Sequence, residues 1–137
     1  MSEKLIKELE DFLSPYVQQR FDYSNAPMGG LAKALMGGRI NQIQQYVIWI
    51  MRAFIRCILS TEKDIYLRDI VSVTIAEAYT MMQFTPMRNI HTYNAEGAAQ
   101  FDLIIEAEIH NWLLYLVEHE KLPGTYNRFS GVYKGSL

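Results

Sequence analysis

One stretch of fourteen residues, 46–59, constrains the fold of this chain more than any other. Arg52 and Arg56 are its only charged residues, and every other position in it is apolar. A helix at a protein surface keeps polar residues on about half of its circumference, so a helix that is apolar nearly all round must be covered on most sides. The cover can come from the rest of the chain, from a second copy, or from a membrane.

A membrane fits this stretch least well. Fourteen residues fall short of the roughly 20 that a transmembrane helix needs. Each arginine near the centre of such a helix would also cost about 2.5–3.5 kcal/mol. We therefore expect no transmembrane span. The choice between an intrachain core and an interface shared between copies stays open.

The apolar residues elsewhere recur with the spacing of amphipathic helices. Ser14-Pro15 separates a first helix from a short segment after it, because proline lacks an N–H and disfavours helical geometry in the residue before it. Paired glycines predict an extra short helix near residues 30–36. No alternating strand pattern is visible, so we predict an all-α fold, a mostly antiparallel four-helix bundle. The principal helices are expected at 3–13, 40–59, 62–83 and 95–121.

The tail, 123–137, is too rich in glycine and serine to be helical, and we separate it from the helical bundle, 1–122, as an extended C-terminal arm. Three interpretations of the tail remain open. The first is a disordered end. The second is an arm whose aromatic residues dock on a neighbouring molecule. The third is a weak nucleic-acid contact through stacking and phosphate pairing. The residues concerned are Tyr126, Arg128, Phe129, Tyr133 and Lys134.

Charge is divided unevenly along the chain, although the formal total is only −2. Residues 23–61 contain no acidic residue and four basic ones, whereas residues 89–120 contain no Lys or Arg and six acidic ones. The two segments can be neighbours in one fold, with exposed charges that contribute little. Alternatively, the basic surface of one copy meets the acidic surface of the next, which would set the register of an assembly.

The two arginines of the apolar stretch need acceptors if they are partly buried. Arg52 and Arg56 are four residues apart and share a helix face. Glu108 lies beside the apolar stripe of the last helix, and we predict that it pairs with Arg52 or Arg56, within or between chains. The candidate interface residues are Trp49, Arg52, Arg56, Glu108, Tyr126, Phe129 and Tyr133.

No recognisable catalytic constellation is present, and we predict no catalytic, cofactor-binding or metal-binding residues. Cys57 lies in the apolar run, where a free cysteine usually acts as a small hydrophobic residue. His110 and His119 are expected at the surface, and neither belongs to a set with metal-ligand spacing. The sequence therefore favours a protein that is not an enzyme.

Paired glycines, an apolar central helix and many Tyr, Ile and Met residues give the chain its general character. The segments concerned are 29–38, Tyr46-Val-Ile-Trp-Ile-Met51 and Tyr133-Lys-Gly-Ser-Leu137. In these features the chain resembles the coat proteins of the large tailed spindle-shaped viruses of archaea. The resemblance implies a virion shell of many copies without a cofactor, and it identifies no functional residue.

These observations together predict a non-enzymatic structural protein that self-associates through apolar helix faces, as a homo-oligomeric viral coat subunit. The alternative is a small helical binding module that regulates or inhibits a host protein. We expect either protein in the virion or the cytoplasm, because the N-terminal residues lack the apolar core of a signal peptide.

Overall fold

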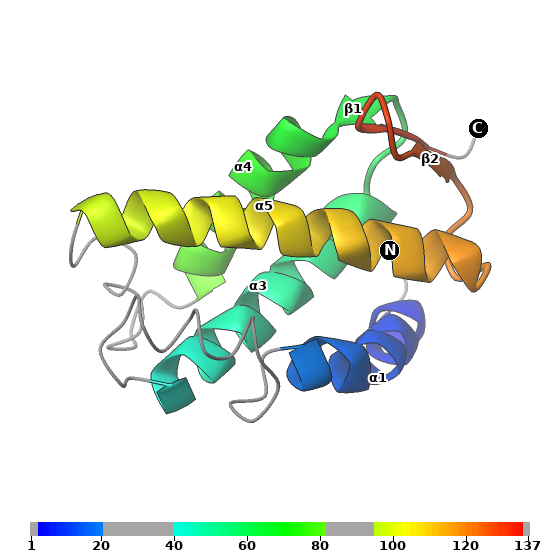
Figure 1. The fold of residues 1–137 in the computed structure, drawn as a ribbon. Helices are drawn as coiled ribbons and strands as arrows, with labels where there is room; N and C mark the ends of the chain where they lie inside the picture. Colours follow the sequence, from blue (N-terminus) through cyan, green and yellow to red (C-terminus); the bar gives the residue numbers. More distant parts are fainter. Residues whose placement is uncertain (1–2, 21–39, 82–94, 136–137) are drawn as a thin grey trace.

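The computed structural model describes residues 3–20, 40–81 and 95–135 (Figure 1). These residues form mainly helices, as predicted, together with three short strands that were not predicted. The predicted helix near residues 30–36 lies outside the described residues. The elements are α1 Glu3–Arg20, α3 Ile40–Leu59, β1 Ile65–Tyr66, α4 Leu67–Met81, α5 Ala95–Glu118, β2 Thr125–Asn127 and β3 Val132–Lys134.

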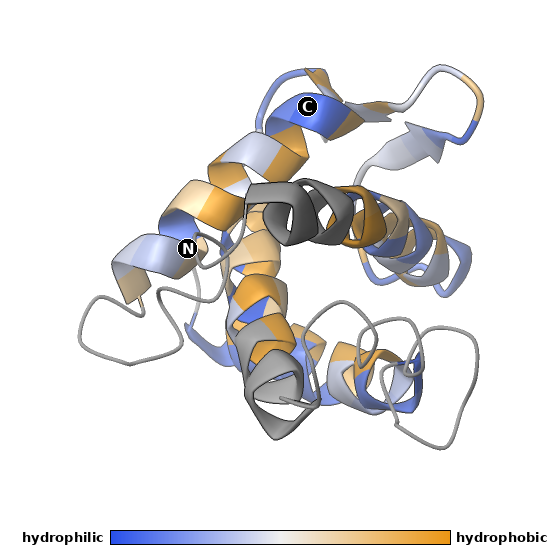
Figure 2. Ribbon diagram, turned by 60° about the vertical axis from the view of Figure 1, so that its left-hand side comes forward, coloured by the Kyte–Doolittle hydropathy of each residue, from blue (hydrophilic) through white to orange (hydrophobic). Residues whose placement is uncertain are grey.

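The apolar stretch forms the last fourteen of the twenty residues of α3, which lies at the centre of the molecule (Figure 2). Helices α1 and α4 pack against it. None of the side chains from Val47 to Leu59 is exposed. One copy of the chain therefore buries most of the apolar surface of this helix. The fully buried side chains are Val47, Ile50, Met51, Ala53, Phe54, Ile55 and Ile58.

Helix α1 continues through Pro15, so the predicted break at Ser14-Pro15 is wrong. Proline removes the bond that its N–H would make to the carbonyl of Asp11, but Asp11 is exposed and water can satisfy that oxygen. Burial holds the two halves together, because one apolar stripe runs along the whole helix. Its members are Ile6, Leu9, Leu13 and Val17.

The tail does not extend away from the helices, and the predicted arm is replaced by a β-hairpin. Strands β2 and β3 pair antiparallel, and β3 also pairs with β1, giving the strand order β1-β3-β2. Helix α4 begins at Leu67 rather than near residue 62, because Ile65 and Tyr66 form the third strand of this sheet. The hairpin thus belongs to the folded domain.

The helices cross one another in both views, with α5 passing over α3 (Figures 1 and 2). The prediction of a mostly antiparallel four-helix bundle is not confirmed by this arrangement. Helix α5 ends beside the sheet, so one end of the molecule combines a helix end with the hairpin. Within the described ranges, no helix is long and apolar enough to cross a membrane.

Candidate functional site

The turn between β2 and β3 presents a phenylalanine ring to solvent. Asn127 closes this turn, because its Oδ1 accepts the backbone N–H groups of Phe129 at 2.8 Å and Ser130 at 3.0 Å. Gly131 takes a φ of 69°, which glycine adopts without strain, and donates its N–H to the Asn127 carbonyl oxygen at 2.9 Å. The turn is therefore well defined, and it leaves Phe129 92% exposed.

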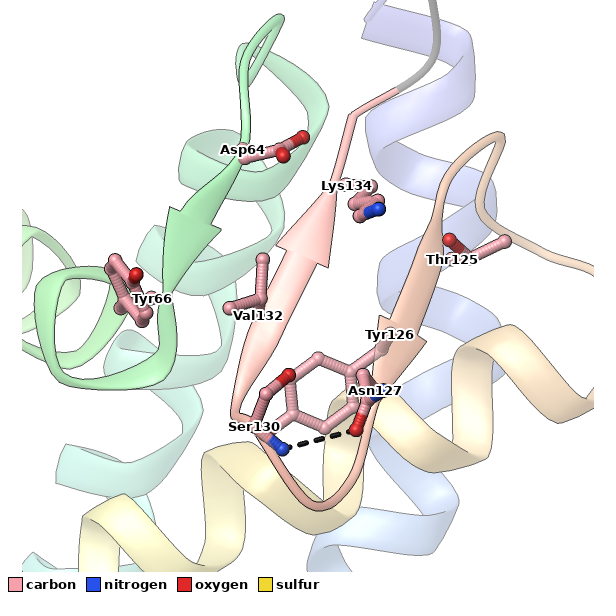
Figure 3. A pocket seen from close by; sticks show the side chains of 8 residues that line it. All are labelled: Asp64, Tyr66, Thr125, Tyr126, Asn127, Ser130, Val132 and Lys134. Atoms are coloured by element: carbon pink, nitrogen blue, oxygen red, sulfur yellow. Dashed lines mark hydrogen bonds between the residues drawn. The ribbon is translucent and has the colours of Figure 1, made fainter.

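The sheet has two faces with different roles. On the inner face, Tyr133 is 1% exposed and its hydroxyl accepts the N–H of Gly124 at 3.2 Å. Ile65 and Tyr126 lie on either side of Tyr133 in register. Successive side chains of a strand point to opposite faces, so the residues next to these three along their own strands face outward. Figure 3 shows this outer face, with Tyr66 and Asn127 in register with Val132.

Strand β1 adds a second aromatic residue, and the start of α4 adds a cation beside it. Tyr66 is 53% exposed, and the guanidinium of Arg68 lies 5.6 Å from the centroid of its ring. The N–H of Leu67 donates to the carbonyl oxygen of Gly131 at 2.7 Å, which ties the start of α4 to the hairpin turn. Residues about sixty positions apart in sequence are thereby held side by side.

Helix α5 supports the hairpin from beneath through His110. Its Nδ1 lies 2.7 Å from the hydroxyl oxygen of Tyr126, and the two rings meet edge to face. Burial raises the pKa of Tyr126, and the negative charge of Glu106 raises it further. The Tyr126 hydroxyl therefore stays protonated near neutral pH and serves as a hydrogen-bonding group.

Two shallow hollows flank the turn and share Tyr66, Tyr126 and Ser130. One, of about 560 Å³, covers the outer face of the sheet and reaches Asp64 and Lys134 (Figure 3). The other, of about 480 Å³, lies between the turn, the start of α4 and α5. We call this region the hairpin surface and define it by Tyr66, Arg68, His110, Tyr126, Arg128, Phe129 and Lys134.

The hairpin surface carries charge opposite in sign to the chain as a whole. Arg68, Arg128 and Lys134 line the hollows with Asp64 as the only acidic lining residue, a local formal charge of +2 against −2 for the chain. Arg128 lies 5.7 Å from the centroid of the Phe129 ring, so it repeats the pairing of Arg68 with Tyr66. Such a surface suits an apolar or planar group with a negative charge beside it.

The predicted interface residues of α3 lie apart from this surface. Trp49 is half-buried beneath Arg52, whose guanidinium lies 5.2 Å from the centroid of the indole ring. Arg56 donates to Glu10 of α1 at 3.3 Å. Both arginines are therefore engaged within their own chain.

The predicted partner of Glu108 was wrong. Glu108 is fully buried and accepts two hydrogen bonds from Arg20, at 2.6 Å from Nε and 2.9 Å from Nη2. Arg20 is the last residue of α1, in the segment that Pro15 was expected to separate from the first helix. The prediction failed because it divided α1 at Pro15. In one continuous helix, Arg20 lies on the same face as Leu13 and Val17.

Among the tail residues, Phe129 and Tyr126 belong to the hairpin surface, and Tyr133 does not. Tyr133 is a core residue and offers no area to a second molecule in this fold. Tyr66, Arg68 and His110 were missed by the sequence interpretation. A two-residue strand gives almost no alternating pattern, so the only signal was the pair Ile65-Tyr66 of strand-favouring residues before a helix.

The hairpin surface has groups that bind and few that react. The raised pKa of Tyr126 keeps its hydroxyl protonated near neutral pH, so no phenolate is available to act as a base. Cys57 lies on α3, and burial raises the pKa of its thiol, which disfavours the nucleophilic thiolate. In the described part of the chain, no group of three or more His, Cys, Asp or Glu side chains is placed to hold a metal ion.

Comparison with known proteins identifies no relative of this chain. The sequence matches no protein-family model, and no curated protein or solved structure shows significant similarity to it.

Proposed function

We propose that this chain is a non-enzymatic structural protein that works by binding other copies of itself, with the hairpin surface as its contact face. The observation that carries the proposal is Phe129, 92% exposed on a turn that Asn127 holds in one conformation. Burying a phenylalanine side chain is worth about 1.5–3 kcal/mol. That free energy is unused in the single chain and becomes available when a partner covers the ring.

The partner is a second copy because of the charge that the chain itself carries. The contact face is locally basic, whereas residues 89–120 contain no Lys or Arg and α5 exposes the carboxylates of Glu106 and Glu118. Complementary charge of this kind orients two surfaces and excludes wrong partners. A coat subunit, as the resemblance to spindle-shaped virus coat proteins implies, would use such a contact many times over in a virion.

Sedimentation velocity over a wide range of concentrations tests this proposal. The wild type is expected to gain mass as concentration rises, and Phe129→Ser should remain monomeric at concentrations where the wild type associates. Val73→Ser is the matched control, because Val73 is 50% exposed on α4 and lines neither hollow. A wild type that stays monomeric throughout overturns self-association and leaves the binding module for another protein as the better function.

Single-stranded nucleic acid is the second candidate partner, favoured by the two arginine–aromatic pairs of the hairpin surface. Bases stack on aromatic rings, and neighbouring cations pair with phosphates. Glu106 argues against it, since its carboxylate acts on Tyr126 at the edge of the same surface and would repel a polyanion. Fluorescence anisotropy of a labelled oligothymidylate at low salt separates the two: saturable binding that Phe129→Ser abolishes supports nucleic acid, and no binding removes it.

A further inference from the structure

Two exposed features lie on one side of the molecule, and they are complementary to each other. The hairpin surface presents Phe129 and Arg128, and α5 presents Leu103, Glu106 and Ala107. Leu103 is 68% exposed, which is a large fraction for a leucine on a helix. Each feature therefore combines an apolar side chain with a charged one, and the charges are of opposite sign.

His110 connects the two features along α5. Residues 103, 106, 107 and 110 share one helix face, because three and four residues make about one helical turn. His110 touches Tyr126 at 2.7 Å, and Leu103 lies seven residues earlier, about 10 Å along the helix axis. Glu106 lies one helical turn before His110 on this face, so its carboxylate is near the boundary between the two features, and its charge raises the pKa of Tyr126.

We propose that the α5 stripe, defined as Leu103, Glu106 and Ala107, is the surface that receives the hairpin of a second copy. In this contact Phe129 of one copy packs on Leu103 of the other, and Arg128 pairs with Glu106. This inference rests on the proposed self-association and names its acceptor. The occupant is a second copy because the stripe offers an exposed carboxylate and an uncovered aliphatic side chain to a hairpin surface whose hollows are lined by three basic residues and one acidic residue.

The contact is two-fold symmetric. Since donor and acceptor lie on the same side of one molecule, a rotation by half a turn about an axis near His110 brings each hairpin onto the other copy's stripe. An interface of this kind uses the same patch twice and closes at two copies. The dimer is then the unit of assembly, and a larger array requires an additional contact elsewhere on the chain.

A charge exchange tests the pairing of Arg128 with Glu106. The dimer dissociation constant is measured by sedimentation equilibrium for Arg128→Glu, for Glu106→Arg and for the double variant. Each single variant places two like charges in contact at both halves of the interface, and we expect the dissociation constant to rise about tenfold or more. The double variant restores opposite charges and should return to within about threefold of the wild type.

A mixture of the two single variants gives an independent reading. Arg128→Glu and Glu106→Arg copies meet with opposite charges at both halves of a two-fold contact, so a heterodimer should form where neither homodimer does. Lys4→Glu and Glu8→Arg are the matched controls, because both residues are exposed on α1 and the charge changes are the same. These controls should leave the dissociation constant unchanged.

The possible failures are distinguishable. If the wild type never dimerises, both the proposed function and this inference fall. If the wild type dimerises and Phe129→Ser abolishes the dimer, but the double variant is no better than the single ones, self-association stands and the α5 stripe is not the acceptor. Association that continues beyond two copies through the restored pair overturns the two-fold geometry.

Discussion

Glu108 is fully buried on α5, and the Arg20 guanidinium at the end of α1 neutralises it through two short hydrogen bonds. The hydrogen bond to Glu108 raises the pKa of Arg20, so the guanidinium keeps its charge. Beside this pair the rings of Tyr16 and Tyr115 stack at a centroid distance of 4.0 Å. A buried carboxylate is costly without its partner, so Arg20 positions the end of α1 against α5.

Arg20→Met is expected to lower the free energy of unfolding by about 2–3 kcal/mol, because it leaves the Glu108 carboxylate buried without a counter-charge. The expected loss falls below the roughly 3–5 kcal/mol of a fully buried pair, because the Arg20 side chain is 33% exposed and water can reach its place. Urea unfolding followed by circular dichroism measures it. The double variant Arg20→Met/Glu108→Met should recover most of the loss, since a well-packed apolar pair can replace a buried ion pair.

Arg56→Met is the matched control for this prediction. Its pair with Glu10 has one hydrogen bond of 3.3 Å and more exposed side chains, 35% and 21%. A partly exposed pair of this kind contributes about 0–1 kcal/mol. Equal losses for Arg20→Met and Arg56→Met would show that the burial of Glu108 does not set the strength of its pair.

At the scale of elements, the hairpin depends on a position where no side chain fits. A Cβ at Gly124 would overlap the carbonyl oxygen of Lys134 and the ring of Tyr133. We expect Gly124→Ala to lower the free energy of unfolding by about 1–3 kcal/mol, as overpacking a filled site does. The adjacent exposed residue supplies the control, Thr125→Ala, with an expected change within about 0.5 kcal/mol. Thermal unfolding of both variants checks the difference, and a Gly124→Ala protein as stable as Thr125→Ala would contradict the close approach.

The long helices were predictable because their apolar periodicity extends over many turns. Residues 40–59 form α3 with the expected bounds, and α5 begins at the expected Ala95. Errors arose where local signals and long-range packing disagree. Pro15 signals a break, yet the buried stripe on both sides of it keeps α1 continuous. Ile65-Tyr66 becomes a strand only because Val132 and Tyr133 lie beside it, and no pattern within residues 61–67 reveals that pairing.

Only the part of the candidate site that lies in the tail was predictable, because the rest depends on long-range strand pairing. Phe129 and Tyr126 stood out as aromatic residues in a glycine-rich tail. Tyr66 lies just before α4 and Arg68 lies in its first turn, and they join the surface because β1 pairs with β3. His110 was expected at the surface, and its contact with the Tyr126 hydroxyl makes it a support for the hairpin.

At the scale of the whole molecule, the cover over α3 changes the reason for expecting self-association. The sequence left open whether one chain encloses residues 46–59 or a second copy shares their cover. Helices α1 and α4 pack on α3, and Phe54 meets Trp112 of α5 edge to face at 5.7 Å. The single chain accounts for this apolar helix, so self-association now depends on the exposed residues of the hairpin surface and the α5 stripe.

Removing residues 124–137 should destabilise the entire domain, because the hairpin belongs to its core. The truncation deletes Tyr133, which is fully buried, and Tyr126, which is half-buried, and it uncovers Ile65 beside them. Each buried side chain of this size is worth about 1.5–3 kcal/mol. A loss of about 4 kcal/mol is then expected, a large part of the 5–15 kcal/mol typical of a domain.

Urea unfolding of the truncated chain measures this loss, with full-length Phe129→Ser as the comparison. Phe129 is almost wholly exposed, so its replacement should change the unfolding midpoint little while abolishing association. A truncated chain that unfolds at the wild-type urea concentration, with its helical content intact, would mean that the tail is a peripheral arm after all. Weakened association of a destabilised truncation cannot separate a lost contact from a lost fold, and this is why the single side chain at the turn is the decisive change.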